Sequence, residues 1–201
     1  MKLSSDSIFV YPTDTVWGIG SSIYSKNGFK RIAEIKKTSD DKPLSIMFGD
    51  INSLYKSFNF PATFSLSWLR NFYKLESTLA IPAKISKISI PSWAIGPKGY
   101  VSLRCVDLPV IKKIAQELNA PFFTTSLNLT GEPPVISYAD AQAFCTQYAK
   151  DAIFFGDQTE TLSGASSTIV FFHGDSFEII REGKNSQEIR KLLSATGLKV
   201  L

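Results

Sequence analysis

Short apolar segments alternate with amphipathic helical segments along the whole chain, and this alternation limits the possible folds more than any other feature. Helices are predicted over residues 26–37, 51–58, 62–72, 107–118, 138–148 and 186–193. Strands are predicted over residues 7–11, 43–48, 77–81, 100–104, 121–126, 152–155, 167–172 and 177–181. A sheet of about seven strands interleaved with helices is typical of an α/β fold.

The last two predicted strands indicate that the sheet is mixed. They are separated only by "HGDS", residues 173–176, which is short enough for a hairpin and therefore for antiparallel pairing. The chain of 201 residues can bury a sizeable core, and no repeat or low-complexity linker divides it. We expect a single domain over residues 1–201. Residues 82–99, with their prolines and glycines, are expected to form a mobile loop.

Polar side chains gather where the predicted strands and the first helix begin or end. Loops converge at strand ends in open α/β sheets, and ligands bind there. The set contains Thr13, Asp14, Thr15, Lys36, Lys37, Thr38, Lys42, Arg104, Thr124, Thr125, Ser126, Asn128, Ser166, Ser167, Thr168 and Arg181. Cations, hydroxyls and an amide suit an anionic, oxygen-rich ligand better than a metal. Each residue alone also fits a turn, a helix cap or a cation at a helix C-terminus.

Several other chemistries find little support. His173 is the only histidine and lies in the predicted hairpin turn, which argues against a Ser-His-Asp mechanism. Neither a Walker phosphate loop nor a Gly-x-Gly-x-x-Gly motif is present. The net charge of +4 favours anionic partners such as nucleotides or RNA. Two cysteines outside any paired motif, with no signal peptide or membrane-length apolar run, predict a cytoplasmic protein without membrane contact.

The segment "VYPTDTVWGIG", residues 10–20, is unusually polar for the end of a strand. It follows an apolar strand with hydroxyls, a carboxylate and an indole within a few residues, which favours a loop that binds a polar ligand. Trp17 either belongs to the core or lies beside that ligand. Gly18 and Gly20 would then allow the ligand to approach the backbone closely.

Several motifs together resemble one known family. "YPTDTVWGIG", "EIKKTSDDKPLSI", "SLRCVDLP", "TTSLNLTGEPP", "SSTIV" and "IIREG" follow the order and approximate spacing of the YrdC-like family of threonylcarbamoyl-adenylate synthases. The resemblance extends from Tyr11 to about Gly183. It implies a twisted mixed β-sheet flanked by helices around a concave basic cavity. It also implies synthesis of L-threonylcarbamoyl-AMP from L-threonine, bicarbonate and ATP with release of pyrophosphate, the first step of t6A modification of tRNA.

The resemblance also implies roles for individual residues. It assigns Lys36, Arg104, Ser126 and Asn128 to catalysis. It assigns Thr15, Thr124, Arg104 and Ser167 to threonine, and Lys36, Lys42, Ser126, Asn128 and Arg181 to ATP. Mg²⁺ would arrive with the ATP phosphates and not in a protein cage. Expected partners are the three substrates, tRNA by direct binding, and the proteins that transfer the labile product in t6A synthesis.

Two departures from the family pattern affect these expectations. Family members usually carry Lys-x-Arg at the end of the first helix, whereas this chain has Thr38 in place of the arginine. Lys37 and Lys42 are the two candidates to compensate for the lost charge. The family's "PGP-x-T" turn is replaced by "KLEST", residues 74–78. An alternative function is therefore a non-catalytic module that binds tRNA or double-stranded RNA in the same cavity. A carbamoyl-transfer domain of the hydrogenase-maturation type shares the fold, but the chain lacks the accessory segments of that type.

Overall fold

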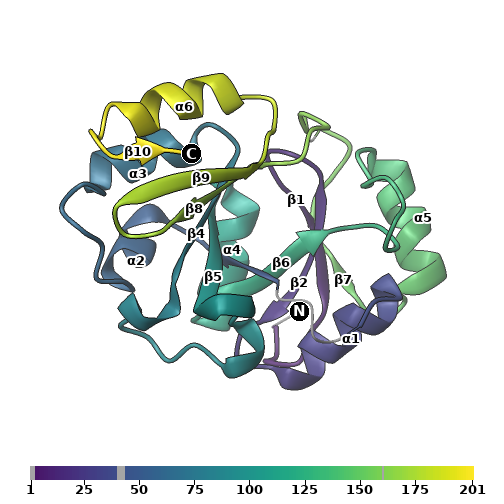
Figure 1. Cartoon of the computed structure of the whole chain (residues 1–201). Helices are drawn as coiled ribbons and strands as arrows, with labels where there is room; N and C mark the ends of the chain where they lie inside the picture. The colour runs from purple at the N-terminus through teal and green to yellow at the C-terminus, as the bar shows by residue number, and fades with distance from the viewer. Residues whose placement is uncertain (1–2, 40–43, 160) are drawn as a thin grey trace.

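One twisted sheet of ten strands runs through this computed structural model, which describes residues 3–39, 44–159 and 161–201 (Figure 1). The strands are β1 (Phe9–Pro12), β2 (Trp17–Ser22), β3 (Ser45–Phe48), β4 (Ser77–Pro82), β5 (Tyr100–Cys105), β6 (Phe122–Ser126), β7 (Ile153–Phe154), β8 (Thr168–Phe172), β9 (Ser176–Arg181) and β10 (Lys199–Val200). Their order across the sheet is β10-β9-β8-β4-β5-β3-β6-β2-β1-β7. Parallel and antiparallel neighbours both occur, and β8 and β9 form the expected hairpin. The mixed α/β fold is therefore confirmed, but the prediction of about seven strands was too low.

The main error concerns β2, which had been interpreted as a ligand-binding loop. This segment turns back after Pro12 and pairs antiparallel with β1 on one side and β6 on the other. Its sequence, Trp-Gly-Ile-Gly-Ser-Ser, is rich in residues that weaken strand propensity, so the apolar pattern did not reveal it. The second missed strand, β10, has two residues, too few for any periodicity.

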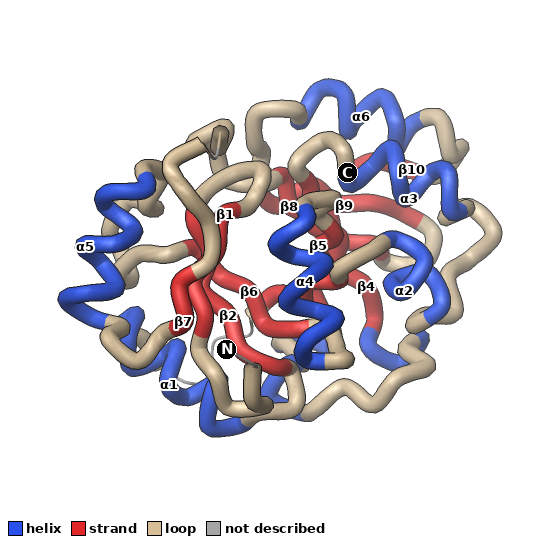
Figure 2. The backbone as a smooth tube through the Cα atoms, turned by 180° about the vertical axis from the view of Figure 1, so that it is seen from behind, coloured by secondary structure: helices blue, strands red, loops and turns tan. Residues whose placement is uncertain are grey.

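The sheet separates the hydrophobic core into two parts, which the helices cover. They are α1 (Lys26–Lys36), α2 (Ile51–Lys56), α3 (Leu66–Tyr73), α4 (Pro109–Leu118), α5 (Tyr138–Tyr148) and α6 (Ser186–Ser194). Helix α4 covers one face of the sheet and contributes Ile111 and Ile114 to a smaller core around Tyr11 and Phe122 (Figure 2). The buried side chains of the other five helices, such as Ile32 of α1, pack into the larger core.

Polar side chains cap several of the helices. Asp50 and Ser137 accept hydrogen bonds from the first turns of α2 and α5. Asp107 does not cap α4, because the cap position is Leu108 and the Asp107 carboxylate forms an ion pair with Lys112 instead. Helix α3 begins four residues later than predicted, after Ser65, which caps it.

Residues 82–99 contain three short 3₁₀ helices, Ala83–Ile85, Ser92–Ala94 and Pro97–Gly99. Ala94 is buried, and Trp93 and Ile95 pack against the larger core. This segment therefore has apolar anchors, and its mobility stays a prediction. Within the described residues, no helix is both long and apolar enough to span a bilayer.

Candidate functional site

A cavity of about 310 Å³ brings together polar residues from distant parts of the chain. Its polar lining consists of Thr13, Thr15, Lys36, Thr38, Ser39, Ser45, Thr78, Ser102, Arg104, Thr124, Thr125, Ser126, Thr130, Ser166, Ser167 and Arg181. Among the described residues that line it, three are cations and none carries a carboxylate. The cavity is therefore basic and rich in hydroxyls, as the pattern of strand ends predicted.

Arg104, on β5, is nearly buried at the cavity wall and is held by two partners. Its Nη2 donates to Oδ1 of Asp14 over 2.6 Å, and its Nη1 donates to Oγ1 of Thr15 over 3.2 Å. Its Nε is buried and has no hydrogen-bond partner among the described residues. Because both partners follow β1 directly, the polar turn between β1 and β2 fixes the orientation of this guanidinium.

Thr13 organises the turn that carries these partners. Its Oγ1 accepts hydrogen bonds from the backbone N–H groups of Thr15 and Val16, at 3.1 and 3.2 Å. It donates to the carbonyl oxygen of Val16 over 2.7 Å and lies 2.9 Å from Oγ1 of Thr15. The reading of Thr13 as a turn former is therefore correct, and its effect is to place Thr15 on the cavity wall.

Lys36, the last residue of α1, links that helix to the loop after β6. Its Nζ donates to the carbonyl oxygens of Ser126 and Asn128, at 2.6 and 2.9 Å, and to Oδ1 of Asn128 at 2.9 Å. Ser126 Oγ donates to the same Oδ1 over 2.7 Å. Asn128 is not part of the lining, so it supports Lys36 and Ser126 from behind.

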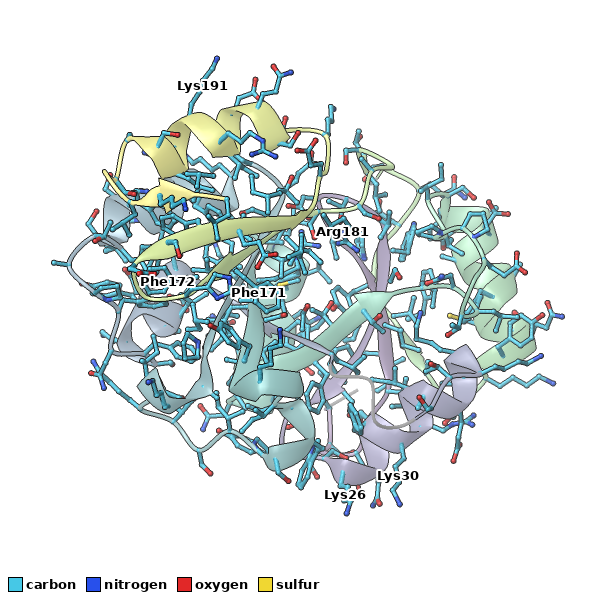
Figure 3. The ribbon with its side chains drawn as sticks, viewed as in Figure 1. Lys26, Lys30, Phe171, Phe172, Arg181 and Lys191 are labelled. Atoms are coloured by element: carbon cyan, nitrogen blue, oxygen red, sulfur yellow. The ribbon has the colours of Figure 1, made fainter. Side chains whose placement is uncertain are left out.

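Arg181, at the end of β9, also lines the cavity. Its Nε and Nη2 donate to the carbonyl oxygen and Oγ of Ser167, both at 3.0 Å, and Ser167 Oγ lies 2.9 Å from Oγ1 of Thr78. Burial, and then the nearby charge of Arg104, lower the pKa of Arg181 below its usual range. Figure 3 shows Arg181 near the middle of the molecule, whereas Lys30 of α1 and Lys191 of α6 point outward. An anion in the cavity would relieve the repulsion between the two arginines.

Thr124 of β6 lines the cavity and accepts a hydrogen bond from the phenol of Tyr11. Tyr11 is fully buried on β1. The sequence interpretation missed Tyr11, because an aromatic residue in an apolar strand is expected to be simply part of the core. It also missed Thr78, whose strand carries no other polar signal that points to the cavity.

Thr38 stands where the family usually has an arginine, and Lys37 and Lys42 are the candidates to replace its charge. Thr38 lines the cavity, as expected for a position that would contact a ligand. Lys37 adopts a left-handed conformation with φ of 51°, and its Nζ lies 5.6 Å from the ring centroid of Tyr148 in α5. Since Lys37 is also absent from the lining, it does not replace the charge. Lys42 lies outside the described residues.

Trp17 packs in the core and also lines the cavity, so the structure supports both interpretations of its position. Its side chain is fully buried, and its ring stacks on Phe154 with centroids 5.1 Å apart. The glycines that follow make room for neighbouring strands: a Cβ at Gly18 would lie 3.1 Å from the ring of Tyr11, and one at Gly20 would lie 2.4 Å from the carbonyl oxygen of Phe123. The interpretation of Gly20 as a ligand contact was therefore wrong, since the polypeptide itself fills that space.

The remaining candidates lie away from the cavity. His173 lies in the β8–β9 turn, where its ring contacts Tyr100 and Glu178 at 3.0 and 2.9 Å. Cys105 and Cys145 are free thiols, and burial raises their pKa to about 12 and about 11. The described residues include no group of three or more His, Cys, Asp or Glu side chains that could hold a metal ion.

Comparison with family models and curated proteins gives consistent matches. The chain matches the Sua5/YciO/YrdC family model, described as "Telomere recombination", over residues 1–183. The threonylcarbamoyl-AMP synthase of Psychrobacter cryohalolentis is 27% identical, with 71% of this chain and 74% of the relative covered. That of Pseudoalteromonas translucida is 25% identical, with 84% and 92% covered.

Solved structures share the fold. Sua5 of P. abyssi, complexed with L-threonine, superposes with a TM-score of 0.79 at 22% identity and covers 98% of this chain. This chain covers 56% of that longer protein. YciO of E. coli superposes with a TM-score of 0.73 at 21% identity, with 90% of this chain and 84% of YciO covered. Full-length HypF shares the fold at 14% identity, and the match covers 23% of its chain.

Proposed function

Because the chain belongs to the Sua5/YciO/YrdC family, we propose that it synthesises L-threonylcarbamoyl-AMP from L-threonine, bicarbonate and ATP. This reaction is the first step of t6A formation in tRNA and makes the protein a nucleotidyltransferase. One observation carries the proposal: Lys36, Arg104 and Arg181, from three distant segments, surround one cavity lined with hydroxyls and no carboxylate among its described residues. Such a cavity suits a polyanion beside a small polar molecule.

The chemistry requires alignment and charge neutralisation more than a general base. The amine of threonine joins bicarbonate to form a carbamate, with loss of water. A carbamate oxygen then attacks the α-phosphorus of ATP, a new P–O bond forms, and pyrophosphate leaves with the electrons of the broken P–O bond. Negative charge spreads over the phosphate oxygens in this transfer, and positioned cations stabilise it. The fixed guanidinium of Arg104 is already oriented for this purpose.

The family pattern divides this one cavity between the two substrates. We assign Thr15, Thr124 and Ser167 to threonine, with Arg104 beside them, and Arg181, Lys36 and Ser126 to the nucleotide. Asn128 would act by holding Lys36 and Ser126 in place. Lys42 is proposed as an ATP ligand from the family pattern alone. Mg²⁺ would enter with the ATP phosphates, because the described lining offers cations and hydroxyls but no carboxylate that would hold the ion.

The rest of the setting is also a proposal. Residues 1–201 would act as one domain, supported by the sheet that includes strands from β1 to β10. A cytoplasmic location suits two free cysteines. The labile product would pass to the proteins that transfer it to tRNA.

The decisive experiment measures pyrophosphate release by the purified chain with ATP and Mg²⁺. Release should require L-threonine and bicarbonate together, and Arg104→Ala and Ser126→Ala should abolish it. Pyrophosphate release that continues without L-threonine or without bicarbonate would refute the proposed synthase activity. If turnover is absent and tRNA or duplex RNA binds tightly with a steep salt dependence, the alternative of a non-catalytic RNA-binding module is correct.

A further inference from the structure

The phenol of Tyr11 reaches the cavity wall from inside the core. Tyr11 lies on β1 and Thr124 on β6, with β2 between them. Tyr11 pairs with Gly18 of β2, and a Cβ there would lie 3.2 Å from the phenol oxygen. The glycine therefore opens the path by which the Tyr11 hydroxyl reaches Oγ1 of Thr124.

This hydrogen bond determines what the Thr124 hydroxyl can offer a ligand. A hydroxyl has one proton to donate and accepts hydrogen bonds on its oxygen. Tyr11 is fully buried, and the donation to Thr124 is the hydrogen bond that satisfies its phenol. Thr124 Oγ1 therefore acts as an acceptor toward Tyr11. Its own proton has no acceptor among the described residues and is available in the cavity.

Thr15 also lines the cavity, and its hydroxyl accepts a hydrogen bond from Arg104 Nη1. Thr13 Oγ1 donates to the carbonyl oxygen of Val16 and accepts the backbone N–H groups of Thr15 and Val16, which use both of its lone pairs. The proton of Thr15 is therefore not committed to Thr13. Of these two hydroxyls, Thr124 is the one whose polarity toward the cavity is set by a buried neighbour.

We propose that Tyr11 is a positioning residue that makes Thr124 a hydrogen-bond donor, so that the amino-acid substrate binds with its carboxylate at Thr124. This inference rests on the proposed function, because it concerns the amino-acid half of the same cavity. A carboxylate accepts hydrogen bonds and cannot donate them, which matches a wall hydroxyl whose oxygen is already engaged. The arrangement selects one orientation of the substrate without contact from Tyr11 itself.

The test compares Tyr11→Phe with wild type by isothermal titration and initial rates, using L-threonine, L-2-aminobutyrate and ATP as probes. Tyr11→Phe removes only the phenol oxygen, and Tyr55→Phe, at an exposed tyrosine away from the cavity lining, is the matched control. We expect Tyr11→Phe to raise the Kd and KM for L-threonine about 3- to 10-fold, the range of one hydrogen bond, with the ATP constants unchanged. L-2-aminobutyrate lacks the hydroxyl of threonine but keeps the carboxylate. Its Kd should therefore rise by the same factor in Tyr11→Phe.

Other outcomes overturn the proposal in distinguishable ways. Unchanged threonine binding, or equal loss for threonine and ATP, would show that Tyr11 only supports the fold. A loss for threonine but not for L-2-aminobutyrate would place the substrate hydroxyl at Thr124. If Tyr11→Phe does not fold, Thr124→Val takes its place and Thr124→Ser must restore binding, and no loss in Thr124→Val refutes the assignment. Failure of the proposed function itself would appear as wild-type protein that binds no threonine.

Discussion

The guanidinium of Arg104 and the carboxylate of Asp14 form a 2.6 Å ion pair in which both side chains are largely shielded from solvent. Asp14 is absent from the cavity lining, whereas Arg104 is part of it. The carboxylate therefore lies behind the arginine and orients it. Thr15 holds the other terminal nitrogen, so the plane of the guanidinium is fixed before any substrate arrives.

Replacing Arg104 with lysine should lower kcat by about 10- to 100-fold while the protein stays folded. An ammonium group has no rigid fork, so it cannot hold Asp14 and Thr15 and also present a fixed face to the substrate. Initial rates of pyrophosphate release measure the effect. Arg31→Lys is the control, because Arg31 is an exposed arginine that pairs with Glu34 and Asp151. Similar rates for Arg104→Lys and wild type would mean that charge alone matters at this position.

Thr38→Arg should tighten ATP binding by about 5- to 10-fold. Thr38 lines the cavity, and an arginine there could pair with phosphate oxygens in a bidentate manner. Isothermal titration of ATP measures the change. Thr38→Gln, which adds length without charge, serves as the control and should leave the affinity close to that of wild type. Unchanged affinity in Thr38→Arg would show that another cation already neutralises the phosphates.

Gly20→Ala should destabilise the fold by about 1–3 kcal/mol, the range expected for overpacking. A Cβ at Gly20 would lie 2.4 Å from the carbonyl oxygen of Phe123 and 2.7 Å from the ring of Phe9. Gly18→Ala should cost less, because its nearest atoms belong to one side chain, Tyr11, at 3.1 Å. Denaturant unfolding compares the two variants. If Gly20→Ala and Gly18→Ala lose the same free energy of unfolding, β2 and β6 can separate locally to accommodate the added Cβ.

The sequence predicted the class of fold and most members of the site, and its errors have physical reasons. The positions of Arg104, Ser126 and Arg181 at the ends of predicted strands allowed them to be predicted as cavity residues, because polar residues at the ends of buried strands lie at the sheet edge. Strand β2 was missed because its glycines fit neighbouring strands, and that fit depends on tertiary packing. Tyr11 was missed for the same reason, since its sequence context is that of an ordinary core residue.

The direction of the Lys37 side chain also depends on structure that a local pattern does not contain. Lys36 and Lys37 are adjacent in the sequence, yet only Lys36 lines the cavity. Helix α1 ends at Lys36, and the left-handed conformation of Lys37 directs its ammonium toward Tyr148 of α5. A sequence motif that counts positive charges cannot separate these two positions.

Stability should fall as the pH rises above about 9, where unfolded cysteine ionises. Burial, with the charges of Asp50 and Asp107, raises the pKa of Cys105 to about 12. Between these values the unfolded chain loses a proton that the folded chain keeps, so unfolding becomes more favourable as the pH rises, by up to about 1.4 kcal/mol per pH unit. Burial also raises the pKa of Tyr11 and Tyr73, which adds to the loss above about pH 10.

Urea unfolding at pH 8 and pH 10.5 tests this prediction. Wild type should lose more stability between the two values than Cys105→Ala, which lacks the thiol. Cys145→Ala is a second test, because the pKa of Cys145 rises to about 11 and its thiol also stays mostly protonated in the folded protein at pH 10.5, so this variant should likewise lose less stability than wild type. If wild type and Cys105→Ala lose the same amount, the Cys105 thiol ionises as readily in the folded protein as in the unfolded chain.

Asn128→Asp should weaken ATP binding about 10-fold and lower the free energy of unfolding by about 1–3 kcal/mol. Asn128 Nδ2 donates to the carbonyl oxygens of Leu129 and Glu132, at 3.0 and 2.7 Å. A carboxylate cannot donate there, so two carbonyl oxygens would lose their donor and face a negative charge. The new carboxylate would also pair with the ammonium of Lys36, and this neutralisation would reduce the attraction of Lys36 for phosphate.

Titration of ATP and denaturant unfolding measure these two losses on the same protein. Asn59→Asp is the control, since it makes the same chemical change at an exposed residue outside the cavity lining. Asn128→Ala separates the causes, because it removes the donor without adding charge. It should lose stability but keep more ATP affinity than Asn128→Asp. If Asn128→Asp binds ATP as wild type does, the Lys36 ammonium does not act on the nucleotide, and its role is limited to joining α1 to the loop after β6.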